Sequence, residues 1–148
     1  MQLSDAALTG LARGCVGLVS LSLNKLPAVS DAALAKVGGL RKLRTLCLRA
    51  CEAGDAAMAA VATLPKLADL DLGYTEVGDG GLYSLASLGS LTSLSLDSCK
   101  LGNAGLRGLR ASDNRLDALP DALGKLTSIT SLRVDGNAIR ELPPSFGA

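Results

Sequence analysis

The chain has 148 residues, a formal net charge of +1 and no histidine. This charge balance gives no bulk attraction to nucleic acid or to an anionic membrane, and no apolar run approaches the ~18–20 residues of a membrane-spanning helix. Hydrophobic residues make up 48% of the chain but aromatic residues only 2%, which suits a core of thin layers of branched aliphatic side chains.

A leucine pattern repeats along the chain in steps of 24 or 25 residues. Leu18, Leu43, Leu67 and Leu91 each open the spacing LxxLxL. A period in the twenties with this spacing indicates repeats made of one short strand and a return segment. Such strands must be parallel, with their leucines inward and the alternate residues outward. The expected strands are Ser20–Leu23, Thr45–Leu48, Asp69–Leu72 and Ser93–Leu96.

Each return segment carries an acidic or amide residue three positions before an apolar one. These residues are Asp5, Asp31, Asp55, Asp79 and Asn103. Side chains of this type accept hydrogen bonds from free N–H groups at a helix start, so we expect them to be helix N-caps. The apolar residues that follow, such as Leu34, Val37 and Leu40, recur every three positions and predict one buried helical stripe.

The turn after each strand carries a small, weakly polar residue. Cys51, Thr75 and Cys99 hold this position, where their side chains can bond to the turn backbone without water; Leu26 holds it in the first repeat and predicts a looser turn. Cys51 and Cys99 lie two repeats apart, beyond the ~7 Å that a disulfide tolerates, so free thiols are expected. Without CxxC or histidine, no metal site is expected.

The pattern changes after Leu101. Two units of a shorter class follow, beginning at Leu106 and Ile129 and marked by Leu119-Pro120 and Leu142-Pro143. The step from Leu91 to Leu106 is below the roughly 20-residue minimum of such repeats. We expect a helix over residues 103–110, with the next strand displaced or lost; the alternative is a compressed unit without a helix. Either way, this junction is expected to be the weakest point.

The whole chain is expected to be a single domain of two repeat classes, one over residues 1–105 and one over residues 106–148. It starts and stops within a unit and lacks polar capping faces, so we expect a fragment. The start, MQLSDAALTGLARG, has no basic start followed by an apolar run, and we therefore expect a cytoplasmic protein without a signal peptide.

Two stretches resemble known repeat families. LSDAALTGLARGCVGLVSLSL and GDAAMAAVATLPKLADLDL resemble the cysteine-containing leucine-rich repeats of F-box substrate adaptors and ribonuclease-inhibitor-like proteins. LRASDNRLDALPDALGKLTSITSLRVDGN resembles the LPxxLxxL class of intracellular signalling scaffolds. These resemblances imply an α/β leucine-rich-repeat solenoid with a concave parallel sheet and short convex helices. The first also implies a ubiquitin-ligase adaptor, although no F-box precedes Leu3.

Catalytic groups are scarce. Without histidine, general-base catalysis needs a carboxylate or a lysine with a tuned pKa. Asp69, Asp71 and Asp97 project from one side of the sheet, but no nucleophile accompanies them, and we interpret them as solvated charges. Cys47 is expected to face outward, where Arg49 would lower its pKa slightly; we interpret it as an inert thiol. We expect no enzymatic activity and no cofactor.

What remains is a binding surface on the outward strand positions. Parallel strands backed by bulkier helices curve, and partners bind the concave strand face. Tyrosine and arginine favour interface hot spots, and the best-placed contacts are Arg49, Asp69, Asp71, Tyr74 and Asp97.

We therefore expect a protein–protein interaction scaffold whose partner is another protein, with no nucleic acid, membrane or small-molecule ligand. One other interpretation is that the small polar residues only keep the sheet soluble. A third is that the chain is a catalytic or regulatory fragment of a larger enzyme.

Overall fold

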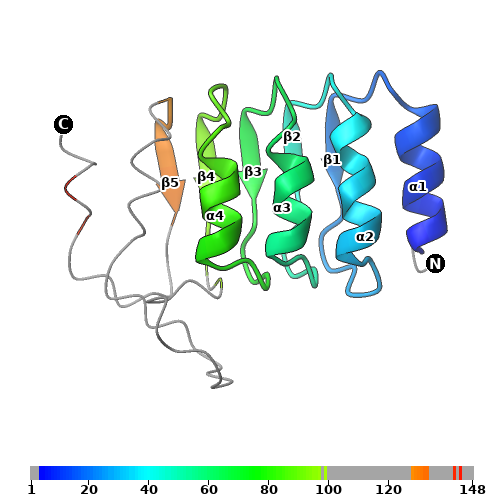
Figure 1. Cartoon of the computed structure of the whole chain (residues 1–148), viewed down its shortest axis with the longest axis horizontal. Helices are drawn as coiled ribbons and strands as arrows, with labels where there is room; N and C mark the ends of the chain where they lie inside the picture. Colours follow the sequence, from blue (N-terminus) through cyan, green and yellow to red (C-terminus); the bar gives the residue numbers. More distant parts are fainter. Residues whose placement is uncertain (1–3, 98, 100–127, 134–141, 143, 145–148) are drawn as a thin grey trace.

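A computed structural model of the chain describes residues 4–97, 99, 128–133, 142 and 144. Within them, five strands form one parallel sheet in the order β1-β2-β3-β4-β5 (Figure 1). The strands are β1 (Ser20–Ser22), β2 (Thr45–Cys47), β3 (Asp69–Asp71), β4 (Ser93–Ser95) and β5 (Ser131–Arg133). The helices are α1 (Asp5–Gly14), α2 (Asp31–Leu34), the 3-10 helix η1 (Ala35–Gly39), α3 (Asp55–Val61) and α4 (Asp79–Leu85).

The sheet register places equivalent leucines side by side. Leu46 of β2 pairs with Leu70 of β3, which pairs in turn with Leu94 of β4. All three side chains are buried, because every second residue of a strand points to the same face. The predicted stack of inward leucines is confirmed, and the residues between them face away from the core.

The helices line one face of the sheet and follow one another along the chain (Figure 1). Their apolar stripe closes the core: Leu34, Val37 and Leu40 are fully buried, as their spacing predicts. Helix α2 continues directly as the tighter η1, and Gly38 of η1 lies close to α3. A Cβ at Gly38 would approach the Ala60 carbonyl oxygen to 3.1 Å. None of the helices among the described residues is long and apolar enough to cross a membrane.

The acidic residues at the helix starts bind the next repeat, and the prediction that they are N-caps is wrong. The N-caps are Ser4, Ser30, Gly54 and Gly78, and each aspartate is the first residue of its helix. Asp31 Oδ1 accepts the N–H of Gly54 at 2.8 Å, and Asp55 Oδ1 accepts that of Gly78 at 2.7 Å. Each carboxylate reaches sideways because the next helix start lies beside it.

Asp5 follows the same rule at the first helix. Its two oxygens accept the backbone N–H of Ser30 at 3.0 Å and its hydroxyl at 2.6 Å. These bonds to Ser30 favour the charged carboxylate and lower the pKa of Asp5. Asn103, expected to act in the same way, lies outside the described residues. The aspartates therefore form a ladder between repeats.

The turn residues bond to the backbone as predicted. Cys51 Sγ donates to the Leu23 carbonyl at 2.8 Å, and Cys99 Sγ donates to the Leu72 carbonyl at 2.9 Å. The hydroxyl of Thr75 donates to the same Leu72 oxygen at 2.6 Å. Each thiol thus reaches back to the preceding repeat, whereas the hydroxyl closes its own turn. All four cysteines are free thiols.

The sheet continues from β4 to a strand much later in the chain. β4 pairs directly with β5, with Ser93 opposite Ser131, and the neighbouring Thr130 side chain bonds to Thr92, 38 residues earlier. The strands β4 and β5 are therefore hydrogen-bonded neighbours, and the strand expected to be displaced or lost in the unit beginning at Leu106 lies outside the described residues. The helix expected over residues 103–110 lies outside the described residues.

Candidate functional site

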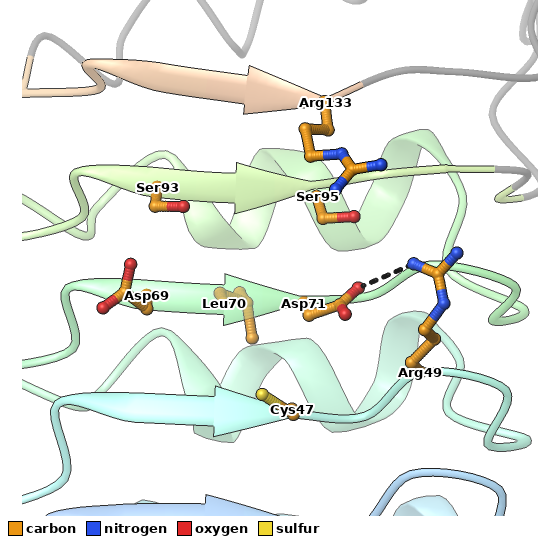
Figure 2. Close-up of a pocket in the computed structure, with 8 residues that line it drawn as sticks. All are labelled: Cys47, Arg49, Asp69, Leu70, Asp71, Ser93, Ser95 and Arg133. Carbon is orange, nitrogen blue, oxygen red and sulfur yellow. Dashed lines mark ion pairs between the residues drawn. The ribbon is translucent and has the colours of Figure 1, made fainter.

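The outward side chains of β2 to β5 surround a small hollow on the strand face (Figure 2). Its lining consists of Cys47, Arg49, Asp69, Leu70, Asp71, Ser93, Ser95 and Arg133. The volume is about 190 Å³, smaller than the roughly 300–1,000 Å³ of typical small-molecule pockets. The hollow has the size to receive one side chain of a partner rather than a free ligand.

Register explains why the hollow forms around β3. Asp71 has Cys47 on one neighbouring strand and Ser95 on the other, and Asp69 is similarly opposite Ser93. Small side chains therefore flank the two longer carboxylates. The space that these neighbours leave unfilled is the hollow.

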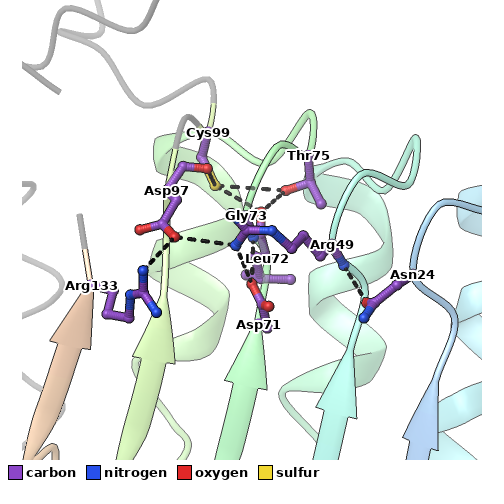
Figure 3. Close-up of polar contacts among 9 residues, drawn as sticks. All are labelled: Asn24, Arg49, Asp71, Leu72, Gly73, Thr75, Asp97, Cys99 and Arg133. Atoms are coloured by element: carbon purple, nitrogen blue, oxygen red, sulfur yellow. Dashed lines mark hydrogen bonds and ion pairs between the residues drawn. The ribbon is translucent and has the colours of Figure 1, made fainter. Parts of the chain in front are cut away.

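A buried carboxylate joins two guanidiniums at one end of the hollow (Figure 3). Arg49 Nη1 lies 3.2 Å from Asp97 Oδ2 and 3.6 Å from Asp71 Oδ1, while Arg133 Nη2 lies 3.7 Å from Asp97 Oδ2. The hydrogen bond that Arg49 donates to Asp97 Oδ2 stabilises the charged guanidinium and raises the pKa of Arg49. Three ion pairs thus tie together four residues, Arg49, Asp71, Asp97 and Arg133.

Backbone contacts also hold Arg49 and Asp71 in place. The N–H of Arg49 donates to Asn24 Oδ1 of the preceding repeat at 3.0 Å, and Asp71 Oδ1 accepts the N–H of Gly73 at 2.9 Å (Figure 3). A Cβ at Gly73 would lie 2.5 Å from Arg49 Nη1. Only glycine leaves room there for the guanidinium to cross the turn.

Tyr74 projects from this turn in an unusual backbone conformation. Its φ is 58°, and Lys25 and Ala50 have φ values of 59° and 57° at the equivalent positions. The left-handed region is disfavoured for residues with a Cβ, but hydrogen bonds between repeats support it, including Tyr74 N–H to the Asp97 carbonyl at 2.7 Å. The ring is exposed, and Arg49 Cζ lies 4.8 Å from its centroid, within the range of a cation–π contact.

The structure brings four of the five predicted contact residues together. Arg49, Asp71 and Asp97 meet at one end of the hollow (Figure 3), and the Tyr74 ring lies against Arg49. Asp69 lies toward the other end of β3 (Figure 2). The interpretation of Asp97 as a solvated charge is wrong, because Asp97 is only 3% exposed and lies against the two guanidiniums. It positions Arg49 and does not present its own carboxylate to solvent.

Sequence reasoning missed Arg133. It comes from β5, opposite Ser95, and its side chain is 65% exposed. The stretch SLRV fits the strand frame and could have pointed to this residue. Its distance from the regular repeats in the chain hid that it lies beside them.

The environment of Cys47 differs from the expectation. Burial is the main cause that raises the pKa of this thiol, and the charges of Asp71 and Asp69 raise it further. The expected lowering by Arg49 is therefore wrong, because that guanidinium is paired with carboxylates. Within the described part of the chain, no group of three His, Cys, Asp or Glu side chains could hold a metal ion.

Comparison with known proteins agrees with this architecture. A family model described as Leucine Rich repeat matches residues 63–86 and 90–109. The chain folds as a leucine-rich-repeat solenoid. No sequence match was found among curated proteins, and the matched model is that of the repeat in general rather than of the cysteine-containing, F-box-type subclass.

Solved structures share the solenoid fold. Internalin C2 from Listeria monocytogenes has a TM-score of 0.70 and 22% identity, covering 94% of this chain and 50% of its own. A second structure is the ectodomain of the receptor kinase GASSHO1/SCHENGEN3 from Arabidopsis thaliana, in complex with CASPARIAN STRIP INTEGRITY FACTOR 2. Its TM-score is 0.58 and its identity 19%, and the match covers 87% of this chain and 17% of the ectodomain. A TLR13–ssRNA13 complex has a TM-score of 0.58 and 18% identity, and the match covers 89% of this chain and 18% of the TLR13 chain. The present chain thus spans half the length of internalin C2 and a smaller share of the other two structures.

Proposed function

We propose that this leucine-rich-repeat chain is a non-enzymatic scaffold that binds a partner protein on its strand face. The observation that carries the proposal is the Arg49–Tyr74 pair, an exposed aromatic ring and a guanidinium held at the edge of the hollow. Tyrosine and arginine are the residue types that supply most interface hot spots.

Pre-organisation supports this role for the pair. Asp97 and Asp71 hold Arg49, and the hydrogen-bonded turn holds the backbone of Tyr74. Side chains that are already ordered lose less conformational entropy on binding, about 0.5–1.5 kcal/mol for each rotamer-rich side chain that need not be immobilised. Surface residues that served solubility alone would not need a buried carboxylate behind them.

A protein partner is favoured over nucleic acid. Two carboxylates balance the two guanidiniums that line the hollow, and the buried Asp97 lies behind them, whereas phosphate backbones are bound by surplus positive charge. Among the similar structures, one receptor is solved with CASPARIAN STRIP INTEGRITY FACTOR 2 and another with single-stranded RNA. The mixed charge of the present strand face suits a polypeptide better than a phosphate backbone. We also propose an intracellular location, because four free thiols suit a reducing compartment.

A second candidate is the substrate-recognition part of an F-box-type ubiquitin-ligase adaptor. The observation that favours it is the pair of thiols in the turns, since Cys51 and Cys99 both bond back to the preceding repeat. Such an adaptor would use the same strand face for its substrate. Sequencing the full-length transcript tests this candidate, because an adaptor needs an F-box joined to these repeats.

Site-specific photo-crosslinking tests the proposed face. The photoreactive residue p-benzoylphenylalanine would replace Tyr74 on the strand face or Tyr83 on α4, which is exposed to a similar degree, 60% against 56%. We expect discrete crosslinked proteins from position 74 only, competed by unlabelled wild type and not by Tyr74→Ala plus Arg49→Ala. Equal crosslinking from both positions, or equal competition by both competitors, would overturn the proposal.

A further inference from the structure

The charges that line the hollow are unevenly paired. Two carboxylates, Asp69 and Asp71, and two guanidiniums, Arg49 and Arg133, belong to its lining. Ion pairs join Asp71 to Arg49, and the buried Asp97 behind the lining to both guanidiniums. Among the described residues, the lining carboxylate without an ion pair therefore lies at the end of the hollow farther from the guanidiniums.

Asp69 is this carboxylate. Among the described residues its exposed side chain makes no hydrogen bond or ion pair. Its register partners, Thr45 and Ser93, carry no charge. Arg44 accepts the Asp69 backbone N–H at 2.9 Å through its carbonyl oxygen, but the two side chains form no ion pair within the described part of the chain.

The wall of the hollow also contains an unsatisfied hydroxyl. Ser95 Oγ is buried and has no hydrogen-bond partner among the described residues, although buried polar atoms are nearly always paired. It lines the hollow together with Asp69 and Ser93, next to the carboxylate of Asp71 (Figure 2). Each of these side chains has an oxygen that can accept a hydrogen bond. The complementary occupant is a cation with several donors.

We propose that the hollow is a socket for an arginine side chain of the partner protein, held by Asp69 and by the oxygens of β3 and β4. This inference rests on the proposed function, because it specifies the chemistry of the partner that docks on this face. A guanidinium presents five N–H donors in one plane, which suits acceptors spread over two strands, whereas an ammonium acts as a point charge. Arg49 and Tyr74 then flank the entering side chain at the adjacent turn.

A small probe tests the socket without the partner. N-acetyl-arginine methylamide would be titrated into the ¹⁵N-labelled chain, with N-acetyl-citrulline methylamide as a neutral probe of nearly the same shape and N-acetyl-lysine methylamide as a second cation. We expect the arginine probe to shift the amide signals of Asp69, Asp71 and Ser95. We expect the lysine probe to bind more weakly and the citrulline probe to leave these signals unchanged.

Two variants separate a specific socket from general attraction to carboxylates. Asp69→Asn should weaken the arginine probe at least fivefold, whereas Glu52→Gln, which neutralises another exposed carboxylate, should leave its affinity unchanged. Equal shifts from the arginine and citrulline probes would overturn the inference, as would an Asp69→Asn titration identical to that of the wild type. Retained signal dispersion in both variants establishes that they fold.

The outcomes for the socket and for the proposed function are distinguishable. Crosslinking from position 74 without specific binding of the arginine probe would leave a protein-binding face whose partner does not insert an arginine. Specific probe binding without crosslinking from position 74 would leave a cation socket and remove the support for a partner-binding face.

Discussion

Replacing Asp55 by alanine is expected to weaken the contact between α3 and α4 rather than the start of its own helix. Asp55 Oδ1 accepts the N–H of Gly78 in the next repeat at 2.7 Å. The N-cap of α3 is Gly54, which makes no side-chain capping bond. Deleting the carboxylate therefore removes a hydrogen bond between repeats, and the Gly78 N–H loses this acceptor.

The magnitude follows from two contributions. A hydrogen bond to a charged group contributes about 1.5–3 kcal/mol, and the low end applies because this bond lies at an exposed position. The negative charge in the first turn of α3 contributes a further ~0.3–1 kcal/mol through the helix dipole. We expect Asp55→Ala to lower the free energy of unfolding by about 2 kcal/mol.

Urea unfolding measures the loss, and amide hydrogen exchange shows where it falls. Exchange should accelerate at Gly78, whereas the amides of Ala57 and Met58 in the first turn of α3 should change less. Glu52→Ala, at an exposed carboxylate in the preceding turn, is the control and should stay within about 0.5 kcal/mol of wild type. Faster exchange confined to Ala57 and Met58, with Gly78 unchanged, would refute the ladder between repeats.

Three further changes test the packing and the charges. Asp97→Asn removes the charge that joins two partly exposed guanidiniums and should cost about 1–3 kcal/mol in urea unfolding; no loss would contradict a positioning role. Burial raises the pKa of Cys99 from 9.0 to about 11, so above pH 9 the unfolded thiol ionises first and stability falls by about 1.4 kcal/mol per pH unit. The stability difference between wild type and Cys99→Ala should therefore shrink from pH 9 to 11, and a constant difference would argue against a buried neutral thiol. A Cβ at Gly81 would meet Val77 Cγ1 at 2.8 Å, so Gly81→Ala should destabilise the chain by about 1–2 kcal/mol despite the higher helix propensity of alanine. A Cβ at Gly10 meets nothing within 4 Å, so Gly10→Ala should stabilise the chain by about 0.5–1 kcal/mol. Equal changes in unfolding free energy for both variants would show that α4 is not closely packed at Gly81.

The candidate site could be predicted only in part from the sequence. Arg49, Asp71 and Tyr74 were found because strand alternation is a local property that fixes which residues face outward. Arg133 was not, because it enters the site through the pairing of β5 with β4, and that pairing spans 38 residues. The burial of Asp97 and its ion pairs with both guanidiniums were equally invisible to a local pattern.

The repeat spacing by itself determined the strands, their inward leucines and the parallel sheet. A period of 24 or 25 residues allows few other ways to bury an apolar face on every unit. Only the tertiary structure decided where the polar side chains find their partners. Asp55 lies at the start of its own helix but bonds to Gly78 of the next repeat, because stacking brings the two helix starts closer than the chain suggests. Hydrophobic periodicity is written into neighbouring residues, whereas a carboxylate binds whichever donor the assembled solenoid places within reach.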